Sequence, residues 1–399
     1  MTLSPAKYIK KYPAVVTAVL VFLFFTGYYV LLLFRHTSSD IQTHAAVAHA
    51  FVVSNDKLTA NFLYFILLAL FTGFSSHYHA YYAAAVLLLS AALAAKWFLN
   101  QKYFSRYTES KNRVGINFAA LAMLFVFALP NIDFLTVKDF YFGQLVPNVW
   151  HNSTVIFLMP FAMLLFFKSY HFLFEEEEVR QKDAIAILVL LVLNSLIKPS
   201  FLFTLLPAVF LLLTLRFIKG TERDKSFIKL LPYAAGILFI AAEYYVIYRL
   251  NYISTVANTT GEASGVALAP FEVWSHFSKN IPFAFLSSLF FPVLYFILQG
   301  KQLLKNRMVC FAAVNFIIGV MEWSLLAEEG VRKFHGNFYW QVVVAAYLLF
   351  LTLVIDFLQR NKEIKLNNPK QVMLAAAVAL HFLWGVFYWV KIIIFRDYN

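Results

Sequence analysis

Residues 14–44 read AVVTAVLVFLFFTGYYVLLLFRHTSSDIQTH, an apolar run that ends at Phe34 and passes directly into a polar stretch. The run is long enough to cross the hydrocarbon core of a bilayer, which takes about 20 residues of helix. It is too long for the apolar core of a signal peptide, and Ala46 and Ala48 lie too far beyond it to mark a cleavage site. It therefore predicts an uncleaved first membrane-spanning helix.

The whole chain has the composition of a polytopic membrane protein. Its 399 residues are 61% hydrophobic and 14% charged, and the mean hydropathy is +0.69. We expect an all-α protein that forms a single transmembrane domain over residues 1–399, with no separate soluble domain. The single Cys310 lies in an apolar block, so disulfides contribute nothing. The net charge of +12 is explained by basic loops that stay in the cytoplasm, so nucleic acid is not a predicted partner.

Eleven segments have nearly the length and apolar character of a span. They are residues 14–35, 79–98, 115–130, 151–168, 184–197, 200–218, 231–249, 281–299, 308–326, 337–358 and 371–394.

The distribution of basic residues predicts how these segments are oriented. Lys7, Lys10 and Lys11 place the N-terminus in the cytoplasm, and later basic clusters fall in every second loop, as cytoplasmic loops require. The pattern holds only if the apolar run 61–75 does not cross. We expect that run to lie in the outer leaflet or against the bundle. The outer surface then contains residues 36–78, 131–150, 250–280 and 327–336, with a tight outer turn at 194–200.

The outer segment 36–78 opens with a helix signal. Ser39 and Gln42 have the spacing of a capping box, which predicts a helix that starts at Asp40 and carries Asp40 and His44 on one face. Ile41, Ala45, Ala48 and Val52 form its apolar face. An acidic residue in a first helical turn also has an ordinary role, because it stabilises the helix through the dipole by about 0.3 to 1 kcal/mol.

This arrangement resembles the GT-C superfamily, the polytopic glycosyltransferases that use polyprenyl-phosphate-linked sugars. Members have a first span, an outer loop that opens with an acidic residue, and two juxtamembrane helices before the second span. Asp40 in SSDIQTHAAVA resembles that acidic position, and NFLYF at 61–65 resembles the second juxtamembrane helix. The resemblance covers about the first hundred residues in motif and the rest in topology alone.

The resemblance implies a role for Asp40 as catalytic base. Many members have two adjacent acidic residues at this position, whereas Ile41 follows Asp40 here. A divalent metal cofactor is therefore not supported by a paired-acid motif, and no other cofactor is indicated. Glycosyl transfer needs a base for the acceptor and cations for the departing phosphate, on which negative charge grows.

Polar residues in the outer loops are candidates for the rest of this site. We assign His44 to orient the carboxylate and assign the donor phosphate to cations in or next to these loops: Arg332, Lys333, Lys198 and Arg249. Sugar or acceptor contacts are assigned to Asn148, Trp150, His151 and His335. Each has an ordinary alternative, as an interfacial anchor, a snorkelling cation or a solvated helix cap. We expect the outer loops to cover one cavity that contains Asp40, His44, His151, Lys198 and Arg332.

The predicted function is transfer of a sugar from a polyprenyl-phosphate donor to a glycan, lipid or protein acceptor. We expect the protein in a bacterial inner membrane, with its site on the outer, periplasmic side. A polysaccharide polymerase or oligosaccharide ligase with a lipid-diphosphate donor would need the same groups. A transporter or flippase is the competing class, although neither an internal repeat nor a pair of Gly/Pro-broken spans is evident in the sequence. A structural assembly partner is the third class.

The first testable prediction concerns topology. Residues 99–114, 218–230 and 359–370 should be cytoplasmic and 61–75 should stay outside, because of the basic-residue bias. Single cysteines labelled from outside intact cells measure this. Modification of a cysteine at position 105 would contradict the scheme.

Overall fold

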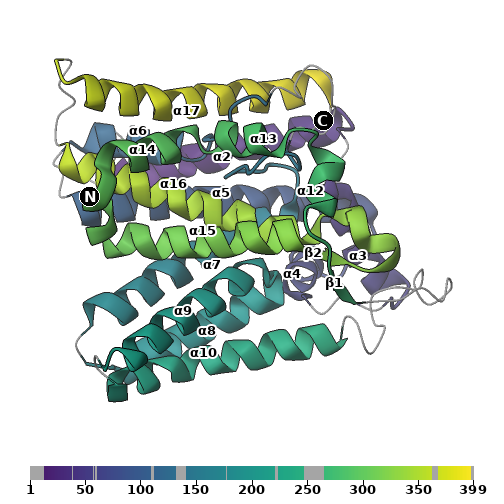
Figure 1. The fold of residues 1–399 in the computed structure, drawn as a ribbon. Coiled ribbons are helices and arrows are strands. Elements are labelled where there is room, and N and C mark those ends of the chain that lie inside the picture. The colour runs from purple at the N-terminus through teal and green to yellow at the C-terminus, as the bar shows by residue number, and fades with distance from the viewer. Residues whose placement is uncertain are drawn as a thin grey trace, which may run out of the picture.

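The computed structural model describes residues 13–37, 39–56, 58, 61–108, 112–131, 141–176, 178–220, 223–246, 265–361 and 367–396. These residues are mostly helical, as the composition predicts (Figure 1). The longer helices are α2 (Pro13–Phe34), α5 (Tyr78–Thr108), α7 (Ser153–Tyr170), α8 (Gln181–Ile197), α9 (Ser200–Ile218), α10 (Arg223–Tyr244), α15 (Arg307–Leu325), α16 (Trp340–Arg360) and α17 (Pro369–Phe395). The shorter elements are α3 (Asp40–Val53), α4 (Leu63–Phe71), α6 (Arg113–Ala122), η2 (His171–Glu175), β1 (Val266–Leu268), α12 (Glu272–Phe277), α13 (Ile281–Ser288), α14 (Phe290–Gln299), η4 (Gly300–Lys305), β2 (Leu326–Glu328), η5 (Gly330–His335) and η6 (Asn337–Tyr339).

In the part of the chain that the structure describes, eight helices are long and apolar enough to cross a membrane. The chain is therefore an integral membrane protein. The count rises to nine if α13 and α14, which are bent by 70° at their junction, form one broken span. The expected count of eleven is not supported, because α6 has only 10 residues and α8 has 17.

The two helices of the first outer segment have the expected positions. α3 begins at Asp40 and buries Ile41, Ala45 and Ala48. α4 has 9 residues, about 14 Å at 1.5 Å per residue, so it is far too short to cross a bilayer. Both lie at the end of the bundle that also contains β1 and β2, on the right in Figure 1.

The predicted capping box at the start of α3 is wrong in its details. Ser39 is the N-cap residue, but its side chain caps no backbone N–H. Its hydroxyl instead donates to Gln42 Oε1, and Gln42 Nε2 donates 2.8 Å to the Thr37 carbonyl. The Ser39 and Gln42 side chains therefore bond within the turn before α3, and Ser39 does not cap that helix.

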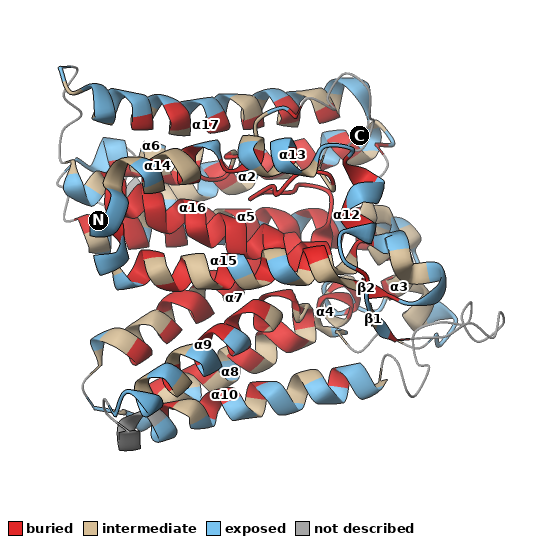
Figure 2. Cartoon of the chain, in the orientation of Figure 1, coloured by how far each residue is buried: buried red, intermediate tan, exposed pale blue. Residues whose placement is uncertain are grey.

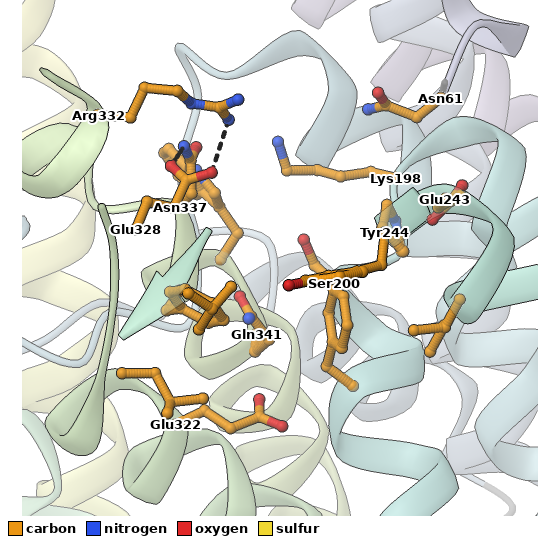
Figure 3. A pocket seen from close by; sticks show the side chains of 17 residues that line it. Asn61, Lys198, Ser200, Glu243, Tyr244, Glu322, Glu328, Arg332, Asn337 and Gln341 are labelled. Atoms are coloured by element: carbon orange, nitrogen blue, oxygen red, sulfur yellow. Dashed lines mark hydrogen bonds and ion pairs between the residues drawn. The ribbon is translucent and has the colours of Figure 1, made fainter. Parts of the chain in front are cut away.

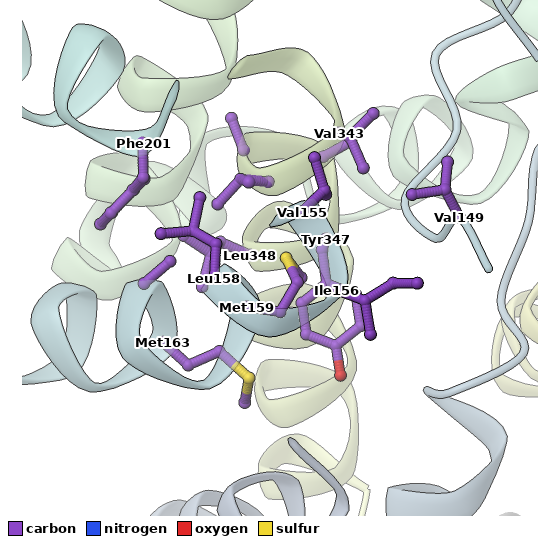
Figure 4. Packing of buried hydrophobic residues seen from close by; sticks show 14 of the residues in the cluster. Val149, Val155, Ile156, Leu158, Met159, Met163, Phe201, Val343, Tyr347 and Leu348 are labelled. Atoms are coloured by element: carbon purple, nitrogen blue, oxygen red, sulfur yellow. The ribbon is translucent and has the colours of Figure 1, made fainter. Parts of the chain in front are cut away.

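Helix α16 is the centre of the bundle, and α17 is at its edge. The span that contains α16 is 94% buried, whereas the α17 span is only 22% buried (Figure 2). α16 packs against α15, α9, α5 and α7. Figure 4 shows this core, in which Val343, Tyr347 and Leu348 of α16 lie among α7 residues and Phe201.

Non-helical chain after α6 runs through the interior, where residues 123–131 replace the second half of the expected span 115–130. Backbone groups buried in a membrane protein must find partners inside the protein. Asn148 Nδ2 donates to the Met123 and Val126 carbonyls (3.1 and 2.7 Å), and His381 Nδ1 lies 2.6 Å from the Phe127 carbonyl. These side chains supply the bonds that a continuous helix would have made.

Close approach of this segment to α17 requires a glycine. A Cβ at Gly385 would lie 1.6 Å from the Phe125 carbonyl oxygen. We predict that Gly385→Ala will lower the free energy of unfolding by about 1 to 3 kcal/mol or more, because backbone must move to admit the methyl group. Thermal unfolding in detergent measures this.

Gly27→Ala in α2 is the matched control, because nothing lies within 4 Å of a Cβ at that position. It should leave the melting temperature unchanged or raise it, since alanine favours helix over glycine by about 1 kcal/mol. Equal effects of the two substitutions would contradict the packing argument.

Candidate functional site

The N-terminus of α7 organises the polar groups at this end of the bundle. Asn152 is its N-cap residue, and Asn152 Oδ1 accepts from the Val155 amide (3.1 Å) and from the Thr154 hydroxyl (2.9 Å). Such caps satisfy amides that have no partner within the helix. The cap uses the oxygen of the Asn152 amide and leaves its Nδ2 group to donate elsewhere.

Three consecutive residues at this N-terminus each contact one residue of the predicted site. Asn152 Nδ2 donates to Asp40 Oδ2 (2.6 Å), Ser153 Oγ lies 3.0 Å from His44 Nδ1, and Lys198 Nζ donates to Thr154 Oγ1 (3.3 Å). Residues from α3, from α7 and from the turn between α8 and α9 thus meet at one point. The predicted carboxylate, imidazole and ammonium groups are brought together.

Burial changes the charge states of these groups. It raises the pKa of Asp40, and the nearby Lys198 ammonium and the Asn152 hydrogen bond offset this only in part. Burial lowers the pKa of Lys198 to about 8, against the opposing effect of Asp40 and Glu328. Burial, with some contribution from Lys198, lowers the pKa of His44 to about 3, so this imidazole is neutral at pH 7.

A cavity of about 460 Å³ opens beside this cluster (Figure 3). Lys198 and Arg332 both line it, whereas Asp40, His44 and His151 do not. Of the five residues that we expected in one cavity, only Lys198 and Arg332 therefore line it. Its polar wall consists of Asn61, Lys198, Ser200, Glu243, Glu322, Glu328, Arg332, Asn337 and Gln341, and its other lining residues are Pro199, Phe203, Ile240, Tyr244, Val266, Leu326, Phe338 and Trp340.

Trp340 lines the cavity and also packs against His151, one of the residues predicted to bind sugar or acceptor. Lys198 Nζ lies 5.4 Å from the centroid of the Trp340 ring, and the His151 ring lies 6.2 Å from it. The Tyr141 ring is 4.5 Å from His151. Burial lowers the pKa of His151 to about 3, so His151 is a neutral ring packed among aromatic residues behind the cavity wall.

The cations of the outer loop 327–336 have carboxylate partners. Arg332 Nη2 lies 2.8 Å from Glu328 Oε1, and Asn337 Nδ2 donates to the other oxygen of Glu328. Lys333 pairs with Glu272 outside the cavity lining. His335 is exposed and also lies outside that lining. Arg249 lies outside the described residues.

Two of the predicted sugar-binding residues lie in the interior. Asn148 accepts a bond from Lys96 Nζ (2.5 Å) and holds the carbonyls of the interior segment. Trp150 is 1% exposed and stacks on Phe127 at 5.6 Å between ring centroids. At this buried position Trp150 can be neither an interfacial anchor nor a contact for a sugar, the two roles considered for it. Both side chains hold residues 141–152 against the core.

Glu243 and Glu322, the two carboxylates that line the cavity from α10 and α15, were not among the residues predicted from the sequence. A signal for them exists, because each is an acidic residue within an otherwise apolar run, where ionisable groups are rare and functional. Asn152, Ser153 and Thr154 were also not predicted as partners of the site, because no local pattern identifies contacts between distant segments.

No family model matches the sequence, and no curated protein matches it. Among the described residues, no group of three or more His, Cys, Asp or Glu is placed to hold a metal ion. Function must therefore be argued from the groups that meet at this site.

The bond between Asn152 and Asp40 gives a stability prediction. Asn152→Asp keeps an oxygen that can cap α7 but replaces the donor with a second carboxylate against Asp40. The variant should lose about 1 to 3 kcal/mol of unfolding free energy at pH 8. The loss should shrink as pH falls, because protonation of either carboxylate removes the repulsion and restores a donor. Thermal unfolding at pH values from about 5 to about 8, where folded proteins are usually most stable, measures it.

Asn368→Asp is the matched control. Asn368 caps α17 by accepting from the Gln371 amide (3.3 Å). A carboxylate at a helix N-terminus is favourable by about 0.3 to 1 kcal/mol, so this change should be neutral or stabilising. A destabilisation by Asn152→Asp that does not depend on pH would show that the contact with Asp40 is unimportant.

Proposed function

We propose that the protein is a membrane glycosyltransferase of GT-C type that uses a polyprenyl-phosphate-linked sugar as donor. The observation that carries the proposal is the convergence of Asp40 and Lys198 on one helix N-terminus, through Asn152 and Thr154. Lys198 also lines the cavity. A base and a phosphate-binding cation are the two groups that glycosyl transfer requires.

Asp40 serves as the general base in this proposal. Its carboxylate takes the proton of an acceptor hydroxyl while the acceptor oxygen bonds to the anomeric carbon. Burial raises the pKa of Asp40, which makes the ionised carboxylate a better proton acceptor near neutral pH. The Asn152 amide fixes the direction of the carboxylate and leaves other lone pairs for the acceptor.

Lys198 and Arg332 stabilise the leaving group. As the bond from the anomeric carbon to the phosphate oxygen breaks, its electron pair stays on the polyprenyl phosphate, and cations nearby lower the energy of that charge. Lys198 has no carboxylate within ion-pair distance among the described residues, and Arg332 retains N–H groups beyond the one that faces Glu328. Apolar residues of the cavity lining, such as Phe203 and Ile240, can contact the polyprenyl chain of the donor.

The proposal includes a topology. If α6 with residues 123–131, α8, and the bent α13 and α14 pair each cross, the chain makes eleven passes, and the cytoplasmic placement of 99–114, 218–230 and 359–370 puts the cavity on the outer side. In a bacterium this is the periplasmic face of the inner membrane. A polymerase or ligase with a lipid-diphosphate donor would use the same groups on an acceptor glycan.

One observation favours transport as a second candidate. Two interrupted helical segments touch, because the Leu129 amide donates to the Ser287 carbonyl (3.2 Å) where α6 has ended and α13 is about to bend. Transporters place substrates at such breaks. Sugar-lipid transfer across proteoliposomes without glycosyl transfer would support this candidate.

The decisive variant is Asp40→Asn. Asparagine keeps the size of the side chain but cannot take a proton, so transfer should fall by about 10²- to 10⁴-fold while the protein stays folded. Incorporation of radiolabelled sugar from a polyprenyl-phosphate donor in membranes measures this. Lys198→Met should instead weaken donor binding and turnover together, because a phosphate contact acts in the ground state and the transition state.

Asp56→Asn is the matched control, since Asp56 is an exposed carboxylate in the same outer segment. It should retain full transfer. Near-normal transfer by Asp40→Asn would leave Asp40 with a purely structural role at the start of α3 and would overturn the proposed base.

A further inference from the structure

A two-stranded sheet forms part of the cavity wall. β1 pairs antiparallel with β2, so that Val266 is opposite Glu328 and Leu268 is opposite Leu326. Opposed residues of such a pair have their side chains on the same face of the sheet, and successive residues alternate between the two faces. Val266, Leu326 and Glu328 line the cavity, whereas Ala267 does not. The face that carries Val266 and Leu268 is therefore the one turned toward the cavity.

The edge of β1 that faces away from β2 carries backbone groups with no partner among the described residues. In an antiparallel ladder, every second residue exchanges hydrogen bonds with the partner strand, and the residues between direct N–H and C=O away from it. The Ala269 amide donates to the Leu325 carbonyl (2.7 Å), so residues 265, 267 and 269 are the ones that face β2. Val266 and Leu268 therefore direct their amides and carbonyls outward, and no hydrogen bond joins these groups to another described residue.

This edge is accessible and has none of the usual protection by side chains. Leu268 is 73% exposed and Val266 is 36% exposed, and the strand contains neither lysine nor proline. Proteins use such residues to keep strand edges from pairing with other chains, because an unpaired edge is a template for a further strand. The shortness of β1, at three residues, limits the pairing to the groups of Val266 and Leu268.

The backbone groups of the edge decide what kind of ligand covers it. A lipid surface would cover the Leu268 side chain but would leave the amides and carbonyls without partners, which costs free energy. A sugar chain does not repeat N–H and C=O groups at the spacing of a strand. An extended polypeptide does, and such segments bind to open strand edges through their main chains.

We propose that β1 binds an extended polypeptide segment as a third strand, which presents a side chain to the cavity. Neighbouring strands lie about 4.8 Å apart, and a residue opposite Val266 has its side chain on the same face as Val266. That face borders the cavity that Lys198 also lines. Combined with the proposed glycosyltransferase function, on which this identification rests, the acceptor is a protein and the accepting group is a serine or threonine hydroxyl. Its oxygen bonds to the anomeric carbon, its proton passes to Asp40, and the phosphate leaves with the electron pair of the broken bond.

The test measures binding of a peptide to the full-length protein in detergent. The probe is a short fluorescein-labelled peptide that alternates threonine and valine between terminal lysines, because these residues favour an extended strand. Its comparison peptide has the same side chains but is N-methylated at the central amides and cannot donate from them. By fluorescence anisotropy the N-methylated peptide should bind at least about tenfold more weakly. Equal affinities, or no binding of the unmodified peptide at millimolar concentration, would overturn the proposal.

Hydrogen exchange resolved to single amides locates the bound peptide. The amides of Val266 and Leu268 should exchange about tenfold more slowly at a peptide concentration of about ten times the Kd, because they then donate to the third strand. The Ala267 amide faces β2 with or without the peptide and should change much less. Slower exchange elsewhere, with none at Val266 and Leu268, would place the peptide on another surface and reject the site at β1.

Variants of Leu268 separate the backbone from the side chain. Leu268→Pro removes an outward amide and no bond to β2, since proline is accepted at edge positions whose N–H points away from the sheet. It should weaken binding of the unmodified peptide about tenfold. Leu268→Thr is the matched control, because it replaces the same side chain but keeps the amide, and its affinity should stay within about twofold of native. Equal weakening by both variants would refute pairing through the backbone. If Leu268→Pro fails to fold, the two peptides and Leu268→Thr decide the question.

Failure of this inference can be separated from failure of the proposed function. Peptide binding requires no transfer, so Asp40→Asn should keep the preference for the unmodified peptide whether or not Asp40 is the base. Transfer that depends on Asp40, together with equal affinities for the two peptides, would retain the enzyme and reject the protein acceptor. Peptide bound at β1 without transfer from any polyprenyl-phosphate donor would retain the binding site and reject the enzyme.

Discussion

The structure depends on one constraint, the need of buried backbone groups for partners inside the membrane. Helix satisfies that need by itself, but residues 123–131 are not helical and lie within the bundle. Asn148 bonds two of their carbonyls and accepts in turn from Lys96, whose ammonium lies 3.7 Å from the Tyr347 ring centroid. This chain of contacts ties residues 141–152 to the core and so fixes where α7 can begin.

The position of that N-terminus determines the candidate site. Because Asn152 caps α7 with its oxygen, its nitrogen is directed to Asp40, and the next two residues contact His44 and Lys198. The groups of the site are therefore held by regular elements and by a cap, which is how a scaffold keeps reactive groups in fixed geometry. A shift of α7 by one residue would separate them all.

Sequence patterns predicted the parts of this structure that local rules determine. Apolar runs identified the long helices, and the start of α3 at Asp40 followed from the polar residues around it. The number of spans did not follow, because an apolar run such as 115–130 has the same composition whether it is helical throughout or ends at Ala122. Asp40, His44 and Lys198 were identified as single residues, but their common partner at 152–154 is a tertiary contact. Asn148 and Trp150 were wrongly predicted to face the sugar or acceptor, because an amide can equally bond buried backbone carbonyls and an indole ring can equally pack in the core.

The cavity brings carboxylates and cations into one space at one end of the bundle. In the interior, the buried Lys96 of α5 donates to Asn148 Oδ1, and Asn148 Nδ2 donates to two backbone carbonyls. Glu243, Glu322 and Glu328 line the cavity near β1 and β2 together with Lys198 and Arg332. Glu176, whose Oε2 has no hydrogen-bond partner, follows η2 at the other end of the bundle. A transported solute needs exchangeable partners along its path, whereas a substrate that reacts at the membrane edge needs them in one place. The second arrangement is the one that these described residues form.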